Sequence, residues 1–199
     1  MSQLADPSPP RATYTDIENA PPGTVAEIVD GALYLQAQPA PPHGDVQDGL
    51  IELLRPPFQR GRGGPGGWWV RSEPELHVPG TGDVLVPDLG GWRQERLPEF
   101  PATWRELKVM PDWVCEILSP STRSLDLIRK RPAYGAAGIP WLWLIDPLAR
   151  TLEVFRNRDG EWSVVGAYEG EADAAVPPFE AVPLSMQEVW GGVADRQHE

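Results

Sequence analysis

Proline and glycine divide this chain of 199 residues into short segments. The 24 prolines and 20 glycines make up about 22% of the residues, which approaches a low-complexity composition without reaching it. Hydrophobic residues at 41% and nine tryptophans supply enough apolar surface for a core. The length suits one domain of ordinary size. We therefore expect a single folded domain over residues 13–190, with flexible tails at 1–12 and 191–199.

Charge and hydropathy limit the classes of partner. The formal net charge of −12 argues against non-specific coating of nucleic acid and against a polybasic membrane contact. A nuclease that uses a divalent cation is compatible with this charge, because such a site gathers carboxylates. The longest uncharged apolar run, residues 139–145, falls far short of the roughly 20 residues that span a bilayer. We expect a soluble, cytoplasmic protein, and the single Cys115 excludes an internal disulfide framework.

Turn residues and hydrophobic spacing predict an alternation of short strands and short helices. Segments typical of strands are residues 24–30, 32–36, 68–78, 83–88, 113–118, 141–145, 151–157 and 161–168. Segments with helical spacing or capping residues are residues 13–20, 43–59, 123–137 and 185–190. We expect Pro56 and Pro57 to end the second helix, and residues 93–111 to form a long loop. This order predicts an α+β, or α/β-like, fold: a mixed central sheet flanked by helices, with added N-terminal and C-terminal hairpins.

Three charged side chains stand inside or at the ends of predicted elements. Asp88 follows a proline at the end of a strand, Glu116 lies within an apolar strand, and Lys130 lies on the next helix. An unpaired carboxylate buried at position 116 would cost several kcal/mol, so Glu116 needs a cation, a proton or hydrogen-bond donors nearby. Lys130 shares a helix face with Asp126 and Tyr134. It can approach Glu116 if that face packs against the strand end.

Two carboxylates and one ammonium that converge on a strand edge suit phosphodiester hydrolysis with a divalent cation. Oxygen ligands favour a hard cation such as Mg²⁺ or Mn²⁺. The cation lowers the pKa of its bound water and offsets phosphoryl charge, and a lysine positions the nucleophile or stabilises the pentacovalent state. Each signal alone is also compatible with a structural role, since a Pro-Asp pair is usually a turn and a strand glutamate is commonly paired for stability.

Other residues have both a functional and a structural interpretation. Glu73 or Glu75 could supply a third carboxylate to the metal site, although alternating polar residues normally mark a solvent-exposed face. His43 either joins the site or caps the following helix. Cys115 should point to the face opposite Glu116, which argues against a thiol nucleophile.

The motifs that contain these residues resemble a known family. They are Val-Pro-Asp88-Leu, Asp-Trp-Val-Cys-Glu116-Ile-Leu-Ser-Pro-Ser-Thr122, Asp126 with Lys130 and Tyr134 at intervals of four, and Gly138-Ile-Pro-Trp-Leu-Trp-Leu-Ile-Asp146-Pro147. Together they resemble the Uma family of putative endonucleases, formerly a domain of unknown function, which is placed in the PD-(D/E)xK restriction-endonuclease-like superfamily. The resemblance runs from about Thr13 to Trp190, and the Ala26-Glu27-Ile28-Val29-Asp30-Gly31 hairpin also matches the family's opening pattern.

The resemblance implies a restriction-endonuclease-like fold and a catalytic site. Asp88 and Glu116 would hold Mg or Mn, Lys130 would be the catalytic lysine, and DNA would be the substrate. One departure is that the superfamily's lysine normally lies two residues after the glutamate, where this chain has Leu118. We also expect a homodimer, because restriction-like enzymes that cut both strands usually need two sites. A non-catalytic interaction or dimerisation module with the same fold is the alternative, because fold does not fix function.

Overall fold

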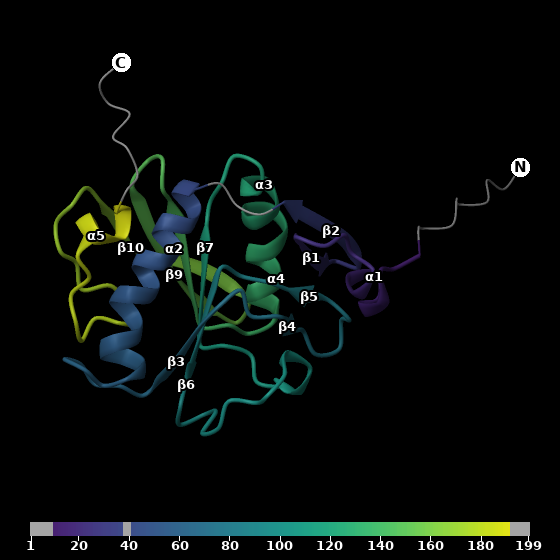
Figure 1. The fold of residues 1–199 in the computed structure, drawn as a ribbon, viewed down its shortest axis with the longest axis horizontal. Helices are drawn as coiled ribbons and strands as arrows, with labels where there is room; N and C mark the ends of the chain where they lie inside the picture. The colour runs from purple at the N-terminus through teal and green to yellow at the C-terminus, as the bar shows by residue number, and fades with distance from the viewer. Residues whose placement is uncertain (1–9, 38–40, 192–199) are drawn as a thin grey trace, which may run out of the picture.

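The structure, a computed structural model, describes residues 10–37 and 41–191 (Figure 1). Most of the two tails expected at residues 1–12 and 191–199 lies outside these ranges. Within them, no helix is long and apolar enough to cross a membrane.

Two β-sheets form the framework of the fold. The larger sheet has the strand order β10-β9-β8-β7-β6-β3, and its strands are β3 (Trp68–Ser72), β6 (Leu89–Arg93), β7 (Trp113–Ile117), β8 (Trp141–Asp146), β9 (Thr151–Arg158) and β10 (Glu161–Glu169). The smaller sheet has the order β2-β1-β5-β4, and its strands are β1 (Thr24–Val29), β2 (Ala32–Ala37), β4 (Leu76–His77) and β5 (Val84–Leu85). Strands β7 and β8 pair in parallel, while their neighbours pair antiparallel. The predicted mixed central sheet is therefore confirmed, as are both hairpins, β1–β2 and β9–β10.

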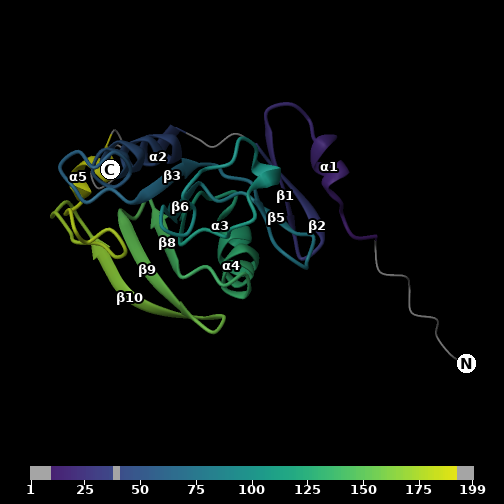
Figure 2. The ribbon, with the colours of Figure 1, turned by 90° about the horizontal axis from the view of Figure 1, so that it is seen from below.

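Helices cover both faces of the larger sheet (Figure 2). The helical segments are α1 (Tyr14–Glu18), α2 (Pro41–Leu54), η1 (Arg55–Gln59), η2 (Trp104–Glu106), α3 (Arg123–Leu125), η3 (Asp126–Lys130), α4 (Arg131–Ala136) and α5 (Met186–Trp190). Helices α2 and α5 contribute to one hydrophobic core together with Trp113 and Cys115 of β7. Val114 faces the second core, which contains Tyr134 of α4. Because side chains alternate along a strand, Glu116 lies on the α4 side, opposite Cys115 as predicted.

Prolines lie where the helices change type. The α-helix α2 ends at Leu54, close to Pro56 and Pro57 as predicted, but the helical path continues through both prolines as the π-helical turn η1. The segment predicted as one helix over residues 123–137 consists of α3, the π-helical turn η3, and α4, which has Pro132 in its first turn. A proline at the start of a helix removes an N–H that has no intrahelical acceptor, and a π-turn absorbs the local change in hydrogen bonding.

The predicted strand over residues 68–78 is two strands in different sheets. The chain turns at Glu73, which has a positive φ of 46°, and Pro74 follows; β3 then belongs to the larger sheet and β4 to the smaller one. A positive φ is uncommon for a residue other than glycine, and an alternating pattern gives no sign of it. Glu73 and Glu75 are consequently not on one strand face.

Strand β6, which contains Gly90 and Gly91, was not predicted from the sequence. In the structure they let aromatic rings approach the centre of the sheet: a Cβ at Gly90 would lie 2.8 Å from Pro74, and one at Gly91 would lie 2.9 Å from Trp113. Close approach of this kind is an established reason for glycine within a strand. Strand β6 lies between β3 and β7 and thereby places Asp88, the residue before it, beside the end of β7.

Candidate active site

Asp88 is held in place by contacts with two parts of the fold, strand β7 and helix α2. Its Oδ2 accepts a hydrogen bond from the backbone N–H of Ile117 at 2.6 Å, which ties it to the end of β7. Its Oδ1 lies 3.0 Å from Nε2 of His43 on α2. The side-chain amide of Gln47, also on α2, donates to the backbone carbonyl of Asp88 at 2.9 Å. The orientation of this carboxylate is therefore fixed before any ligand binds.

His43 is a buried partner of Asp88. Burial alone would lower the pKa of its imidazole, but the hydrogen bond and charge of Asp88 outweigh that effect and the pKa is raised. Its Nδ1 is buried and makes no hydrogen bond within the described residues. His43 therefore lies beside the predicted site, and Asp88 favours its protonated form.

Glu116 is almost completely buried on β7, with 2% of its surface exposed. Its Oε1 lies 2.9 Å from Nζ of Lys130 and accepts a short hydrogen bond from the hydroxyl of Tyr134. Burial raises the pKa of Glu116 well above its usual value, although Lys130 opposes that shift. Nearby Asp126, Asp88 and Glu27 raise it further. The partner that a buried strand glutamate requires is thus present, and it is Lys130.

The ammonium of Lys130 has a partner for each of its three N–H donors. It lies 2.9 Å from Glu116 and 3.0 Å from Oε1 of Glu27, and it donates to the backbone carbonyl of Val86 at 2.9 Å. Oδ1 of Asp126, one helical turn earlier, is 3.8 Å away. Burial would lower the pKa of Lys130, but these carboxylates raise it well above the usual value. Lys130 is therefore a charged, fully coordinated counterion.

Glu27 is a member of this cluster that the predicted site residues did not include. It is fully buried, accepts from the N–H of Val86 at 2.6 Å and accepts from the side-chain amide of Gln36 at 2.5 Å. The sequence carried a signal, because Glu27 lies on the same face of β1 as Val25 and Val29. A carboxylate within an apolar strand is also the feature that singled out Glu116. In addition, Glu27 lies in the hairpin segment 26–31 that resembles the opening motif of the family.

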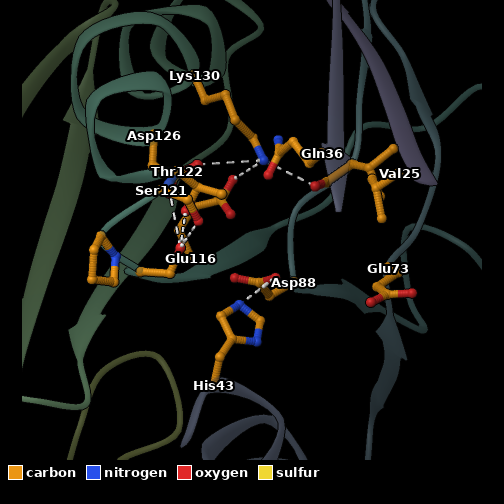
Figure 3. Close-up of a pocket in the computed structure, with 13 residues that line it drawn as sticks. Val25, Gln36, His43, Glu73, Asp88, Glu116, Ser121, Thr122, Asp126 and Lys130 are labelled. Carbon is orange, nitrogen blue, oxygen red and sulfur yellow. Dashed lines mark hydrogen bonds and ion pairs between the residues drawn. The ribbon is translucent and has the colours of Figure 1, made fainter. Parts of the chain in front are cut away.

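The predicted site residues line one cavity of about 320 Å³ (Figure 3). Asp88, Glu116 and Lys130 all contribute to its wall, and so do His43 and Glu73. Figure 3 shows the carboxylates of Asp88 and Glu116 on the same space, with His43 below Asp88 and Glu73 at the side. Strands of both sheets, helix α2 and the α3–α4 segment thus meet at this cavity.

Glu75, the other candidate for a third carboxylate, is absent from the lining of that cavity. Its Oε1 accepts from the hydroxyl of Tyr14 at 2.9 Å and lies 2.6 Å from Nε2 of His77. Of the two glutamates considered from the sequence, Glu73 borders the site, whereas Glu75 helps to fasten α1 to the smaller sheet.

The acidic groups at the cavity are of the chemical type that binds a hard divalent cation. The ammonium of Lys130 interacts electrostatically with four carboxylates, those of Glu116, Glu27, Asp126 and Asp88, so the cluster has more acidic than basic groups. Burial raises the pKa of Asp126 to about 6, against the opposing effect of Lys130. In the described ranges no group of three or more His, Cys, Asp or Glu side chains is arranged to hold a metal by itself. Mg²⁺ usually takes one or two carboxylates and completes its shell with water and substrate phosphate. Asp88 and Glu116 are the two carboxylates that could serve as such ligands at this cavity.

Comparisons with known proteins agree on a family and a fold. The sequence profile of Uma2, described as "Putative restriction endonuclease", matches residues 11–187. A similar solved structure is that of a putative nuclease belonging to DUF820 from Anabaena variabilis ATCC 29413. The two chains are 22% identical, the match covers 90% of this chain and 97% of the other, and the TM-score is 0.67. The search of curated proteins found no match.

Proposed function

Because the chain belongs to the Uma2 family of putative restriction endonucleases, we propose that it is a metal-dependent endonuclease of the PD-(D/E)xK type that hydrolyses phosphodiester bonds in DNA. Family membership supports nuclease activity. The metal dependence and the DNA substrate are our proposal. The observation that carries it is the cavity in which Asp88, Glu116 and Lys130 meet.

Each residue has a distinct role in this proposal. Asp88 and Glu116 hold Mg²⁺ or Mn²⁺, which when bound would acidify a water ligand and offset phosphoryl charge. The hydrogen bonds from Ile117 and His43 orient Asp88. Lys130 keeps Glu116 in place at 2.9 Å and adds a fixed positive charge in a buried setting, where electrostatic stabilisation of a developing anion is strongest.

Isothermal titration with Mn²⁺ tests the metal site. We expect the wild-type protein to bind Mn²⁺ and Asp88→Ala to lose most of that binding, because one of the two proposed carboxylate ligands is gone. Glu75→Gln removes a carboxylate outside the cavity and should bind Mn²⁺ like the wild type. A wild-type protein that binds no Mn²⁺ would remove the basis of the metal-dependent mechanism and favour the interaction-module alternative.

We propose further that the protein acts in the cytoplasm, which cell fractionation can test.

We also propose that the protein is a homodimer. Leu35 of β2 and Ile128 of η3 are 49% and 63% exposed and line one surface groove beside the site. Exposed apolar side chains such as these two are suited to the centre of a two-fold interface, with polar residues around them. Light scattering should show a dimer that Ile128→Asp converts to a monomer. A wild-type monomer at every concentration would contradict this.

A further inference from the structure

Four arginines gather at one edge of this acidic protein. Arg55 is the first residue of η1, and Arg60 directly follows that turn. Arg62 lies in the next loop, and Arg71 belongs to β3. Residues 53–72 contain these four arginines and no aspartate or glutamate, although the whole chain has a net charge of −12. Within the described residues, none of the four forms an ion pair. We call this group the arginine edge.

Two of these guanidinium groups meet at the outer edge of the larger sheet. Strand β3 is the terminal strand of that sheet. Nε of Arg55 and a terminal nitrogen of Arg71 donate to the same acceptor, the carbonyl oxygen of Val70, at 3.2 and 3.1 Å. Arg71 also donates to the side chain of Gln59 at 3.1 Å. Two like charges thus share one neutral acceptor.

Within the part of the chain that the structure describes, neither Arg55 nor Arg71 is paired with a carboxylate. Burial and then the charge of Arg60 lower the pKa of Arg55, and burial and then the charge of Arg55 lower that of Arg71. Arginine nevertheless stays protonated in proteins, so the repulsion between these groups persists. A clustered positive charge without a carboxylate attracts a polyanion and raises its local concentration. Planar guanidinium groups are well suited to phosphate oxygens.

The arginine edge is continuous with the candidate site. Arg71 precedes Glu73, which borders the cavity, by two residues of extended chain, or about 7 Å. Helix α2 leads from His43 at the cavity to Arg55, a rise of about 18 Å at 1.5 Å per residue. Figure 1 shows α2 running down to the loop that precedes β3. That span corresponds to about five base-pair steps of DNA at 3.4 Å each.

We propose that the arginine edge binds the phosphate backbone of DNA on one side of the bond to be cleaved. This inference rests on the proposed function and adds the direction in which the substrate leaves the cavity. The carboxylates at the cavity repel phosphates unless a metal ion offsets their charge. The arginine edge attracts phosphates outside that acidic site and does not depend on a metal ion to do so.

Arg60 and Arg62 provide the test, because Arg55 and Arg71 also satisfy the edge of β3. Both are exposed, so Arg60→Gln/Arg62→Gln should leave the fold intact. The matched control is Lys108→Gln/Arg158→Gln, which removes the same charge from two exposed positions outside the arginine edge. The probe is a fluorescein-labelled duplex of mixed sequence, with binding followed by fluorescence anisotropy in EDTA at several salt concentrations.

We expect the wild type and the control to bind the duplex with the same salt dependence. The plot of the logarithm of the binding constant against the logarithm of the salt concentration has a negative slope. For Arg60→Gln/Arg62→Gln this slope should be less steep by about 1.8, because each phosphate that is no longer neutralised makes it less steep by about 0.9. No duplex binding by the wild type, or equal slopes for all three proteins, would overturn the inference. Cleavage assays with Mn²⁺ test the proposed nuclease activity separately. A duplex that is bound but never cleaved would contradict that activity and would not contradict DNA binding by the arginine edge.

Discussion

Replacing Lys130 by methionine should lower the free energy of unfolding by about 3–5 kcal/mol at pH 7, the usual cost of leaving buried charge uncompensated. Glu27 and Glu116, which are 0% and 2% exposed, would lose the ammonium that both of them contact. The carbonyl of Val86 would also lose its donor. Urea unfolding followed by tryptophan fluorescence measures the change.

Two further variants show whether charge is the cause. Glu27→Gln/Lys130→Met removes one of the uncompensated charges and should recover part of the stability. Arg123→Gln breaks an ion pair in which Arg123 is 52% exposed, and should cost less than about 1 kcal/mol. If Lys130→Met costs no more than Arg123→Gln, the buried cluster is not held by this ammonium. Activity of Lys130 variants is meaningful only at temperatures where they are folded.

Glu116→Gln should abolish the rise in melting temperature that Mn²⁺ produces and leave the metal-free protein equally or more stable. The folded-state pKa of Glu116 is raised, so its stabilising contribution is complete below its unfolded pKa. That contribution is lost as pH rises through the folded pKa. Glutamine imitates the neutral form and can still accept from Lys130 and Tyr134. In the wild type, Mn²⁺ stabilises the folded state by mass action, and scanning calorimetry at pH 7 measures the shift.

Two controls belong to this experiment: a series of measurements at lower pH, and the variant Glu75→Gln. The Mn²⁺ shift in the wild type should shrink as pH falls and protons compete for Asp88 and Glu116. Glu75→Gln should keep the full shift. Heavy destabilisation of metal-free Glu116→Gln would instead identify the carboxylate as a structural partner of Lys130, and the metal-site proposal for this residue would fail.

The sequence was most informative where burial demanded a partner. A carboxylate in an apolar strand needs compensation, and this reasoning leads from Glu116 to Lys130, which are in contact. The same reasoning applies to Glu27, but its segment is also typical of a hairpin, in which an alternating polar residue normally faces solvent. The roles of Asp88, Glu116 and Lys130 in catalysis stay predictions.

Other features depend on backbone geometry that hydrophobic patterns do not encode. The positive φ of Glu73 separates it from Glu75 and sends two parts of one apparent strand into different sheets. Strand β6 was not predicted, and its Gly90 and Gly91 occupy places where a side chain would collide with Pro74 and Trp113. Of the two π-turns, η1 contains Pro56 and Pro57, and η3 directly precedes the helix that has Pro132 in its first turn.

Lys130 links the two sheets. Glu27 belongs to the smaller sheet and Glu116 to the larger one, and both contact the same ammonium. Pulling the sheets apart would leave both buried carboxylates without their shared cation, and salt screens a buried ion pair less than it screens a surface one. Local opening that frees one sheet alone is therefore costly. The two sheets should lose protection from hydrogen exchange together, as one cooperative unit.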